Sequence, residues 1–267
     1  MITVKGQEIA RKILDELQSQ VAALSSKPLF VDLLIGDDPV SRSYVNIKKK
    51  RAEEIGLEFK LAQMPASAST AQVLAGLQEI QTEKKLAGLI IQLPLPSHLN
   101  QSTILAAIEP QFDVDGLTDK SKFVPPTAAA VLAVLDSLNL ELSQKKILVI
   151  GQGELVGKPV TFLLRQRGLT VETADDSTNL KSIAPNADII ISGTGQPKLI
   201  TSDLIKPDAI LIDCGTAESG GGIVGDVDLE SVRDKASIVS PVPGGVGPIT
   251  VAKLLANVVE SAIALKK

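Results

Sequence analysis

Tyr44 and Lys48 are separated by four positions, the spacing that places two side chains on one face of a helix. A phenol next to an amine suits proton transfer, because the phenol can orient a substrate while the amine accepts and returns the proton. Lys48 also begins a basic run, residues 48–51, and such runs are typical of a solvated helix surface. The pair is therefore a candidate catalytic pair, and an exposed helix face is its alternative.

A lone amide and two carboxylates extend this candidate site. Gln92 ends the apolar segment 88–91, just before Pro94. A buried amide needs hydrogen-bond partners, so Gln92 either faces a binding site or is satisfied by loop backbone. Asp113 and Asp115 lie on one side of an extended segment. No third ligand accompanies them, so we expect no metal and interpret them as carboxylates that bind an amino-substituted heterocycle.

A glycine-rich loop follows the apolar segment 147–150 and precedes a predicted helix at 157–166. A strand, a glycine turn and a helix form the context in which dinucleotides bind, with the pyrophosphate at the helix N-terminus. The loop has one residue more than the usual fingerprint, so a purely structural turn is the alternative. The candidate cofactor-binding residues in this loop and at the start of the helix are Gly151, Gln152, Gly153, Val156, Gly157 and Pro159. Gly193 and Thr194, which follow the predicted strand 188–192, are also candidates.

Asp175 and Asp176 follow the next predicted strand, at about the 20-residue offset where an acidic side chain binds the adenosine ribose. Two carboxylates there would repel a 2′-phosphate, so they favour NAD over NADP as the cofactor. Capping of a helix predicted at 177–184 is the alternative role.

The segment 241–250, Pro-Val-Pro-Gly-Gly-Val-Gly-Pro-Ile-Thr, contains three prolines and three glycines. This composition predicts a rigid loop without regular helix or central strand, with bare backbone against which a flat ligand can lie. A predicted strand at 236–239 and a predicted helix at 249–265 would hold it at both ends. We assign Pro243, Gly244 and Gly245 to substrate binding, with an ordinary surface connection as the alternative.

Alternating helical and apolar segments predict an α/β protein with largely parallel sheets. We expect two α/β domains flanking a cleft: residues 1–137 with the catalytic residues, and 138–247 with a Rossmann-like, dinucleotide-binding sheet. The last helix, 248–267, is expected to pack back onto the first domain. The remaining predicted helices are at 9–24, 40–55, 69–82, 102–108, 126–138 and 180–184, and the remaining strands at 29–35, 58–63, 89–92, 170–173, 188–192 and 209–213.

The composition of the 267-residue chain narrows the class of protein. Its single cysteine excludes an internal disulfide, and a net charge of −4 with mixed signs offers no basic stripe for nucleic acid. No apolar run approaches the roughly 18 residues of a membrane span, and the N-terminal residues lack the apolar core of a secretory signal. We therefore expect a cytoplasmic small-molecule enzyme without nucleic-acid or membrane partners.

In this order, the motifs resemble the bifunctional methylenetetrahydrofolate dehydrogenase/cyclohydrolase family, known in bacteria as FolD. The match runs nearly end to end, and Gly-Leu-Ile-Ile-Gln-Leu-Pro-Leu-Pro at 88–96 and the segment 241–250 are its most specific parts. Residues 36–48, 113–116 and 225–228 also match. The resemblance implies that the first domain binds folate, the second binds the dinucleotide, and the chain commonly forms a homodimer.

The resemblance also implies roles for individual residues. Lys48 matches the catalytic lysine, Tyr44 the residue that packs on the folate, Gln92 the glutamine that assists the lysine, and Asp115 the carboxylate that holds the pterin. The implied reactions are oxidation of 5,10-methylenetetrahydrofolate with NADP or NAD and hydrolysis of the methenyl product to 10-formyltetrahydrofolate.

Three departures from the family pattern affect these expectations. The usual Gly-Arg-Ser of the glycine loop is Gly-Gln-Gly at 151–153, and the usual Cys-His-Ser after the next strand is Ala-Asp-Asp at 174–176. The missing arginine and serine hold the 2′-phosphate in the family, so we predict NAD where the family uses NADP. The segment 117–123 is shortened, which predicts a more open folate site.

Two other functions are left open. The chain could be a monofunctional cyclohydrolase with an impaired dehydrogenase, because the catalytic residues match while the nucleotide loop has changed. It could instead be a non-catalytic regulatory module that binds NAD or folate, although such a module has no evident need for Tyr44, Lys48, Gln92 and Asp115 together.

Overall fold

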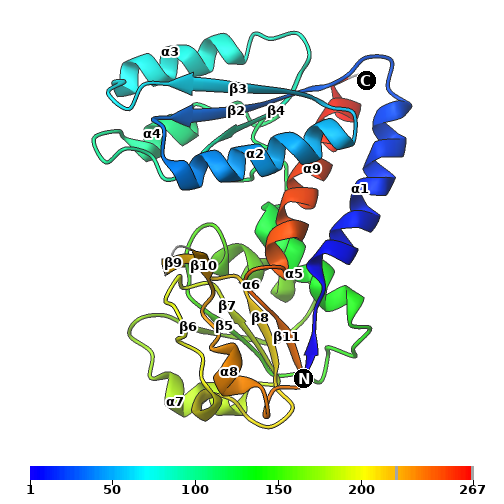
Figure 1. Ribbon diagram of the computed structural model, residues 1–267, viewed down its shortest axis with the longest axis vertical. Coiled ribbons are helices and arrows are strands. Elements are labelled where there is room, and N and C mark those ends of the chain that lie inside the picture. Colours follow the sequence, from blue (N-terminus) through cyan, green and yellow to red (C-terminus); the bar gives the residue numbers. More distant parts are fainter. Residues whose placement is uncertain (220–221, 266–267) are drawn as a thin grey trace. The chain divides into compact units, whose positions relative to one another are not determined.

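The computed structural model describes residues 1–219 and 222–265 (Figure 1). The chain divides into two compact units, which are named here by their main sheets. The three-stranded unit comprises Lys12–Pro126 and Val251–Lys267, and the six-stranded unit comprises Met1–Arg11 and Thr127–Thr250. These bounds differ from the predicted domains because the first residues of the chain pair with the end of the six-stranded sheet.

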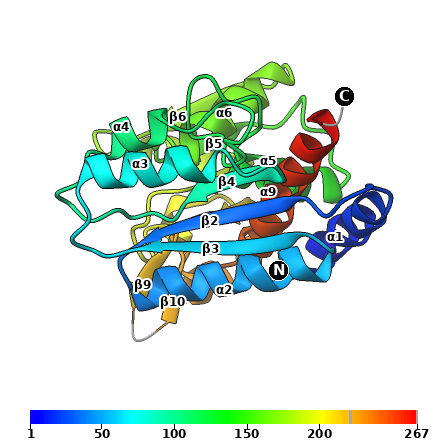
Figure 2. The same ribbon diagram turned by 90° about the horizontal axis from the view of Figure 1, so that it is seen from above.

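The sheet of the three-stranded unit is parallel, with β2 (Leu29–Ile35) between β3 (Glu58–Met64) and β4 (Leu86–Ile91). Every residue of β2 is buried, as expected for a central parallel strand covered on both faces. Figures 1 and 2 show α3 (Thr70–Ile80) on one side of this sheet and α2 (Pro39–Glu54) on the other.

The two faces of this sheet have separate apolar cores. Odd-numbered residues of β2 pack with Val73 and Leu77 of α3 and with Ile104 of α4 (Gln101–Ala106). On the other face, Phe30 packs in a cluster with residues of α2, of α1 (Gly6–Ala22) and of α9 (Val246–Ala264). This two-residue alternation determines which side chains of β2 point toward α2.

Local sequence explains where the helices of this unit begin. Asp38 caps α2 by accepting a hydrogen bond from the Ser41 amide at 2.8 Å, and Pro39 occupies the first helical position. Ser69 and Gln72 form a capping box at the start of α3. The α2 cap fixes the register that places Lys48 on a buried face.

The sheet of the six-stranded unit is parallel throughout, in the order β1-β11-β8-β7-β5-β6. The chain leaves β5 to form β6 on one side and then β7 on the other, so the carboxyl ends of β5 and β7 flank a topological switch point, where α/β sheets bind ligands. The strands are β1 (Ile2–Thr3), β5 (Ile147–Ile150), β6 (Val171–Ala174), β7 (Ile189–Ser192), β8 (Ile210–Asp213) and β11 (Ile238–Ser240).

Helices and a small hairpin complete this unit. The helices are α5 (Pro126–Ser137), whose first residue belongs to the other unit, α6 (Gly157–Gln166), α7 (Leu180–Ile183) and α8 (Leu229–Val232). The antiparallel hairpin of β9 (Ala217–Ser219) and β10 (Gly222–Val224) was not predicted, and neither was β1.

The last helix begins earlier than predicted. The sequence predicted no regular helix within residues 241–250, but α9 starts at Val246 and includes Pro248 in its first turn. Proline is tolerated there because its missing N–H would have no partner within the helix.

By length and composition, α9 is also the one helix among the described residues that could cross a membrane. Over half of it, 56%, is buried inside the fold, and Leu255 and Val258 lie in the core beside Phe30. Core packing therefore accounts for its apolar composition.

Candidate functional site

Lys48 lies on the buried face of α2, and only 7% of the residue is exposed. Its Nζ donates a hydrogen bond to Gln92 Oε1 at 2.7 Å and lies 2.7 Å from Asp32 Oδ2. The exposed-face alternative is therefore wrong for Lys48, although its neighbour Lys49 is exposed. Tyr44 lies one turn earlier on the same helix and is half-buried.

Gln92 is held in one orientation. Its backbone N–H donates to Leu33 O at 2.9 Å, which continues the pairing of β4 with β2. Its side-chain Nε2 donates to Leu93 O at 2.6 Å, so Oε1 is directed to Lys48. The bond to Leu93 O is the predicted contact with loop backbone, and the remaining amide oxygen is bound by Lys48.

The two carboxylates after β4 have different partners. Asp113 is fully buried, and its carboxylate accepts hydrogen bonds from the Leu117 amide at 3.2 Å and from the Thr118 amide and hydroxyl at 2.9 and 2.7 Å. These bonds close a turn through Gly116, whose φ of 67° favours glycine. Asp113 therefore builds the loop that carries Asp115.

Asp115 follows on this loop and is half-buried. Desolvation of its carboxyl, opposed by the charge of Lys48 and reinforced by the carboxylates of Asp113 and Asp32, raises its pKa to about 6. A partly buried carboxyl within electrostatic range of the Lys48 amine is suited to receive the N–H groups of a ligand.

The glycine loop after β5 combines two glycines that packing requires with one that it does not. A Cβ on Gly151, which has a φ of 85°, would lie 2.8 Å from Gly193 O, and one on Gly157 would collide with Gly151 O. A Cβ on Gly153 would meet nothing within 4 Å. Gly153 therefore borders open space.

The residues around this loop fit the pyrophosphate of a dinucleotide. Val156 is the N-cap of α6 and supplies no side-chain hydrogen bond to the first helical N–H groups. The Lys158 amide donates to Gly153 O at 3.2 Å, so the start of α6 lies beside Gly153, whose Cα side is open, at the switch point of the sheet. On the β7 side, a Cβ on Gly193 would lie 2.7 Å from Val156, and Thr194 N donates to Asp226 Oδ2 at 2.8 Å. The two loops are thus packed closely and held in place.

Asp175 and Asp176 are exposed after β6. Asp175 accepts hydrogen bonds from the amide and hydroxyl of Ser177 at 3.0 and 2.7 Å, and these bonds lower its pKa. Asp175 therefore caps a turn, whereas the predicted capping of a helix at 177–184 is wrong because α7 begins at Leu180 with Asn179 as its N-cap.

The proline–glycine segment is fixed by the start of the chain. Gly6 N donates to Gly244 O at 2.9 Å, and a Cβ on Gly6 would collide with Gly245 O. The Val242–Pro243 bond is cis and Gly244 has a φ of 101°. Pro243, Gly244 and Gly245 belong to the six-stranded unit, whereas Lys48 belongs to the three-stranded unit.

Two family models match the chain, one over each of two successive segments. Residues 4–115 match the family model described as the tetrahydrofolate dehydrogenase/cyclohydrolase catalytic domain, and residues 125–266 match its NAD(P)-binding domain. The chain belongs to this family. The resemblance inferred from the motifs and the prediction of α/β architecture with parallel sheets are thereby confirmed.

Relatives within the tetrahydrofolate dehydrogenase/cyclohydrolase family match over nearly their whole length. The bifunctional protein FolD of Exiguobacterium sibiricum is 35% identical and covers 98% of this chain and 99% of its own. The FolD structure from Campylobacter jejuni is 34% identical with a TM-score of 0.94, each chain being 99% covered. FolD of Trypanosoma brucei, complexed with NADP and an inhibitor, is 30% identical with a TM-score of 0.95, covering 100% of this chain and 98% of its own.

Sequence reasoning missed one residue of the site in this family member. Asp32 is fully buried in β2 and pairs with Lys48. The signal was a single carboxylate in the otherwise apolar strand Leu-Phe-Val-Asp-Leu-Leu-Ile, because a buried charge requires a partner. Among the described residues, no group of three or more His, Cys, Asp or Glu is placed to hold a metal ion.

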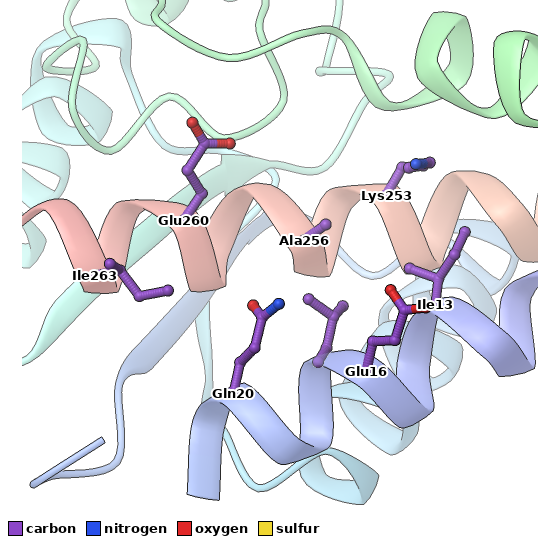
Figure 3. Close-up of a pocket in the computed structure, with 8 residues that line it drawn as sticks. Ile13, Glu16, Gln20, Lys253, Ala256, Glu260 and Ile263 are labelled. Atoms are coloured by element: carbon purple, nitrogen blue, oxygen red, sulfur yellow. The ribbon is translucent and has the colours of Figure 1, made fainter. Parts of the chain in front are cut away.

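A pocket of about 360 Å³ lies apart from these residues, between α1 and α9 (Figure 3). Gln20 of α1 and Glu260 of α9 are among the residues that line it. None of its lining residues belongs to the candidate site.

Proposed function

We propose that this chain oxidises 5,10-methylenetetrahydrofolate with NAD and hydrolyses the 5,10-methenyl product to 10-formyltetrahydrofolate. One observation carries the proposal: a buried amine, Lys48 Nζ, is held 2.7 Å from Gln92 Oε1 and acts electrostatically on the Asp115 carboxyl. The family models for a catalytic and an NAD(P)-binding domain support both activities.

Asp115 is the group that we expect to bind the pterin. With a pKa of about 6, it is mostly ionised at pH 7 and can accept two N–H bonds from the amino-pyrimidine edge of the substrate. Tyr44 offers an aromatic ring one turn from Lys48, on which the flat pterin can pack.

The oxidation requires alignment rather than proton transfer. When bound, the nicotinamide accepts a hydride from the bridging carbon of the substrate, and a nitrogen lone pair of the folate stabilises the resulting cation. The open backbone at Gly153 and the start of α6 would hold the pyrophosphate and so position the dinucleotide.

The hydrolysis requires a proton acceptor and donor. Water attacks the bridging carbon of the methenyl cation while Lys48 Nζ accepts one of its protons. Lys48 then returns a proton to N5 as the bond between that nitrogen and the bridging carbon breaks. The remaining hydroxyl proton is released to solvent, so 10-formyltetrahydrofolate forms with the net release of one proton.

The preference for NAD rests on charge. Asp175 has a lowered pKa and is ionised at neutral pH, where it would repel a 2′-phosphate. Gln152 carries no charge, and its Nε2 donates to Gly151 O at 3.1 Å and to Val149 O at 3.3 Å. A relative complexed with NADP shows that other family members bind the phosphorylated cofactor.

One set of assays tests the proposal against both alternatives. Absorbance of the reduced nicotinamide is followed with methylenetetrahydrofolate and with NAD or NADP, and methenyl absorbance is followed separately. Hydride transfer together with hydrolysis supports a bifunctional enzyme. Hydrolysis alone indicates a monofunctional cyclohydrolase, and binding without turnover indicates a regulatory module. A lower Kd for NADP than for NAD would contradict the cofactor preference.

A further inference from the structure

Asp32 is a charged residue at a position where the fold needs an apolar one. It lies in the middle of β2, has no exposed surface, and is in register with Leu61 of β3 and Ile90 of β4. The even-numbered residues of β2 face α2, where Phe30 packs in the apolar cluster. Asp32 is the one charged residue of this strand.

Lys48 is the partner of this carboxylate. The distance between Asp32 Oδ2 and Lys48 Nζ is 2.7 Å, and the side chains are 0% and 9% exposed. Beyond this ion pair, neither carboxyl oxygen of Asp32 has a hydrogen-bond partner among the described residues. A buried ion pair is often no more stabilising than apolar residues of similar volume, so stability alone does not account for Asp32.

We propose that Asp32 is a positioning residue that holds the Lys48 amine against Gln92 and shares its proton during hydrolysis. The inference rests on the proposed function, in which Lys48 transfers protons. Two contacts of 2.7 Å hold Lys48 Nζ from the side of the sheet. One is to Asp32 of β2, and the other is to Gln92, which directly follows β4.

The pair can hold its proton in two arrangements. With the proton on nitrogen, the pair is an ammonium and a carboxylate; with the proton on oxygen, it is an amine and a carboxylic acid, and the total charge is unchanged. Only the amine has the lone pair that accepts a proton from water. Burial raises the pKa of Asp32, which favours the uncharged arrangement, while the charge of Lys48 opposes it.

Two further carboxylates act electrostatically near Lys48 and Asp32. Asp113 and Asp115, from the segment after β4, act electrostatically on the same site, while Gln92 at the end of β4 is uncharged. The Asp113 carboxylate already accepts three bonds from its own loop, and Asp115 is assigned to the pterin. Asp32 is therefore the carboxylate available to Lys48 throughout the reaction.

The two activities should respond differently to the loss of Asp32, because hydrolysis moves protons and hydride transfer does not. We expect Asp32→Asn, which keeps the side-chain shape, to lower kcat for hydrolysis by about 100-fold. Dehydrogenase kcat should change by less than about fivefold. Asp32→Val, typical of a buried strand, should give the same split.

Two further variants isolate the effect. Asp188→Asn removes the carboxylate of another ion pair, 2.6 Å from Lys206 in the six-stranded unit, and should leave the ratio of the two activities unchanged. In a Lys48→Met background, Asp32→Asn should cause no further loss of hydrolysis, since it acts through Lys48.

The outcomes separate this inference from the proposed function. Equal losses of both activities, or wild-type hydrolysis in both Asp32 variants, would overturn the role of Asp32. If Lys48→Met itself hydrolyses normally, the proposed function fails first.

Discussion

Asp113 and Asp115 are two residues apart, yet their carboxyl groups have opposite surroundings. The Asp113 carboxylate is fully buried and accepts three hydrogen bonds from Leu117 and Thr118, whereas Asp115 is only partly buried and lies within electrostatic range of the Lys48 amine. One carboxylate is used to fold the loop, and the other is presented by that loop. This division separates a structural from a ligand-binding role within a four-residue motif.

The Asp115 carboxylate should bind folate at a cost in stability. We expect Asp115→Asn to raise KM for the folate by about tenfold or more at pH 7, because a hydrogen bond to a charged group is lost. In the wild type, KM should rise as the pH falls below about 6, the pKa of this carboxyl, and the variant should lose that dependence. Steady-state kinetics between pH 5 and 8 measure both effects, with the exposed Asp119→Asn as the control.

Asp115→Asn should weaken folate binding without lowering the free energy of unfolding. The folded pKa of Asp115 is raised, so between about pH 4 and pH 6 the folded state keeps a proton that the unfolded state has lost. The contribution of this group to the free energy of unfolding is therefore greatest at low pH and declines as the pH rises to about 6. Asp115→Asn should be at least as stable as the wild type at pH 7 by urea unfolding, and a clear loss of stability would contradict this assignment.

Lys48 should be essential for hydrolysis. We expect Lys48→Met to lower the hydrolysis rate by at least about 100-fold while the protein stays folded, because the proton acceptor is gone. The free energy of unfolding should fall by about 3–5 kcal/mol, since Asp32 stays buried without its counter-charge. Methenyl absorbance and urea unfolding test these effects.

Lys49→Met provides the matched control for this variant. Lys49 is the exposed neighbour of Lys48 on α2, and it should tolerate the change in both assays. Normal hydrolysis by Lys48→Met would remove Lys48 from its role.

Gly153 and Gly157 should respond differently to alanine. We expect Gly153→Ala to keep the wild-type melting temperature, since its Cβ meets nothing within 4 Å, but to raise the Kd for NAD about tenfold by obstructing the approach of the pyrophosphate. Gly157→Ala should lower the melting temperature, because its Cβ collides with Gly151 O. Thermal unfolding and NAD titration distinguish the two. Unchanged NAD affinity in Gly153→Ala would mean that the pyrophosphate lies elsewhere.

Charge at two positions should determine the choice of cofactor. The double variant Gln152→Arg with Asp175→Ser adds a cation and removes an anion, while the serine hydroxyl can still accept a bond from the Ser177 amide. We expect the ratio of Kd for NADP to Kd for NAD to fall at least about tenfold. Asp234→Ser, which removes an exposed charge elsewhere in the same unit, should leave the ratio unchanged. No change in the double variant would place the ribose away from these residues.

The hydrophobic pattern of the sequence was sufficient to predict the longer helices and strands. It was insufficient for elements that depend on partners distant in the sequence. The apolar run interrupted only by Asp32 predicted β2 at its observed bounds, and the ranges predicted for α2 and α3 lie within two residues of the observed helices. β1 is only two residues long, and its partner is β11, so nothing local marks it as a strand. Val246 was expected in a loop because the segment is rich in proline and glycine. The first turn of a helix nevertheless tolerates proline, so α9 begins there.

The sequence likewise predicted the local spacing within the candidate site but not the contacts between distant segments. The i, i+4 spacing of Tyr44 and Lys48 predicted a shared helix face, and the structure buries Lys48 on that helix. That Asp32 would need a counter-charge could be read from its apolar neighbours, but the identity of that partner depends on how α2 packs on the sheet.

The pairing of β1 with β11 also constrains biosynthesis. Val4 donates a hydrogen bond to Val239, and Gly6 donates one to Gly244, so residues 4 and 6 wait for partners translated more than 200 positions later. The edge of this sheet can therefore close only after residue 244 has been translated, and until then β1 has no partner strand.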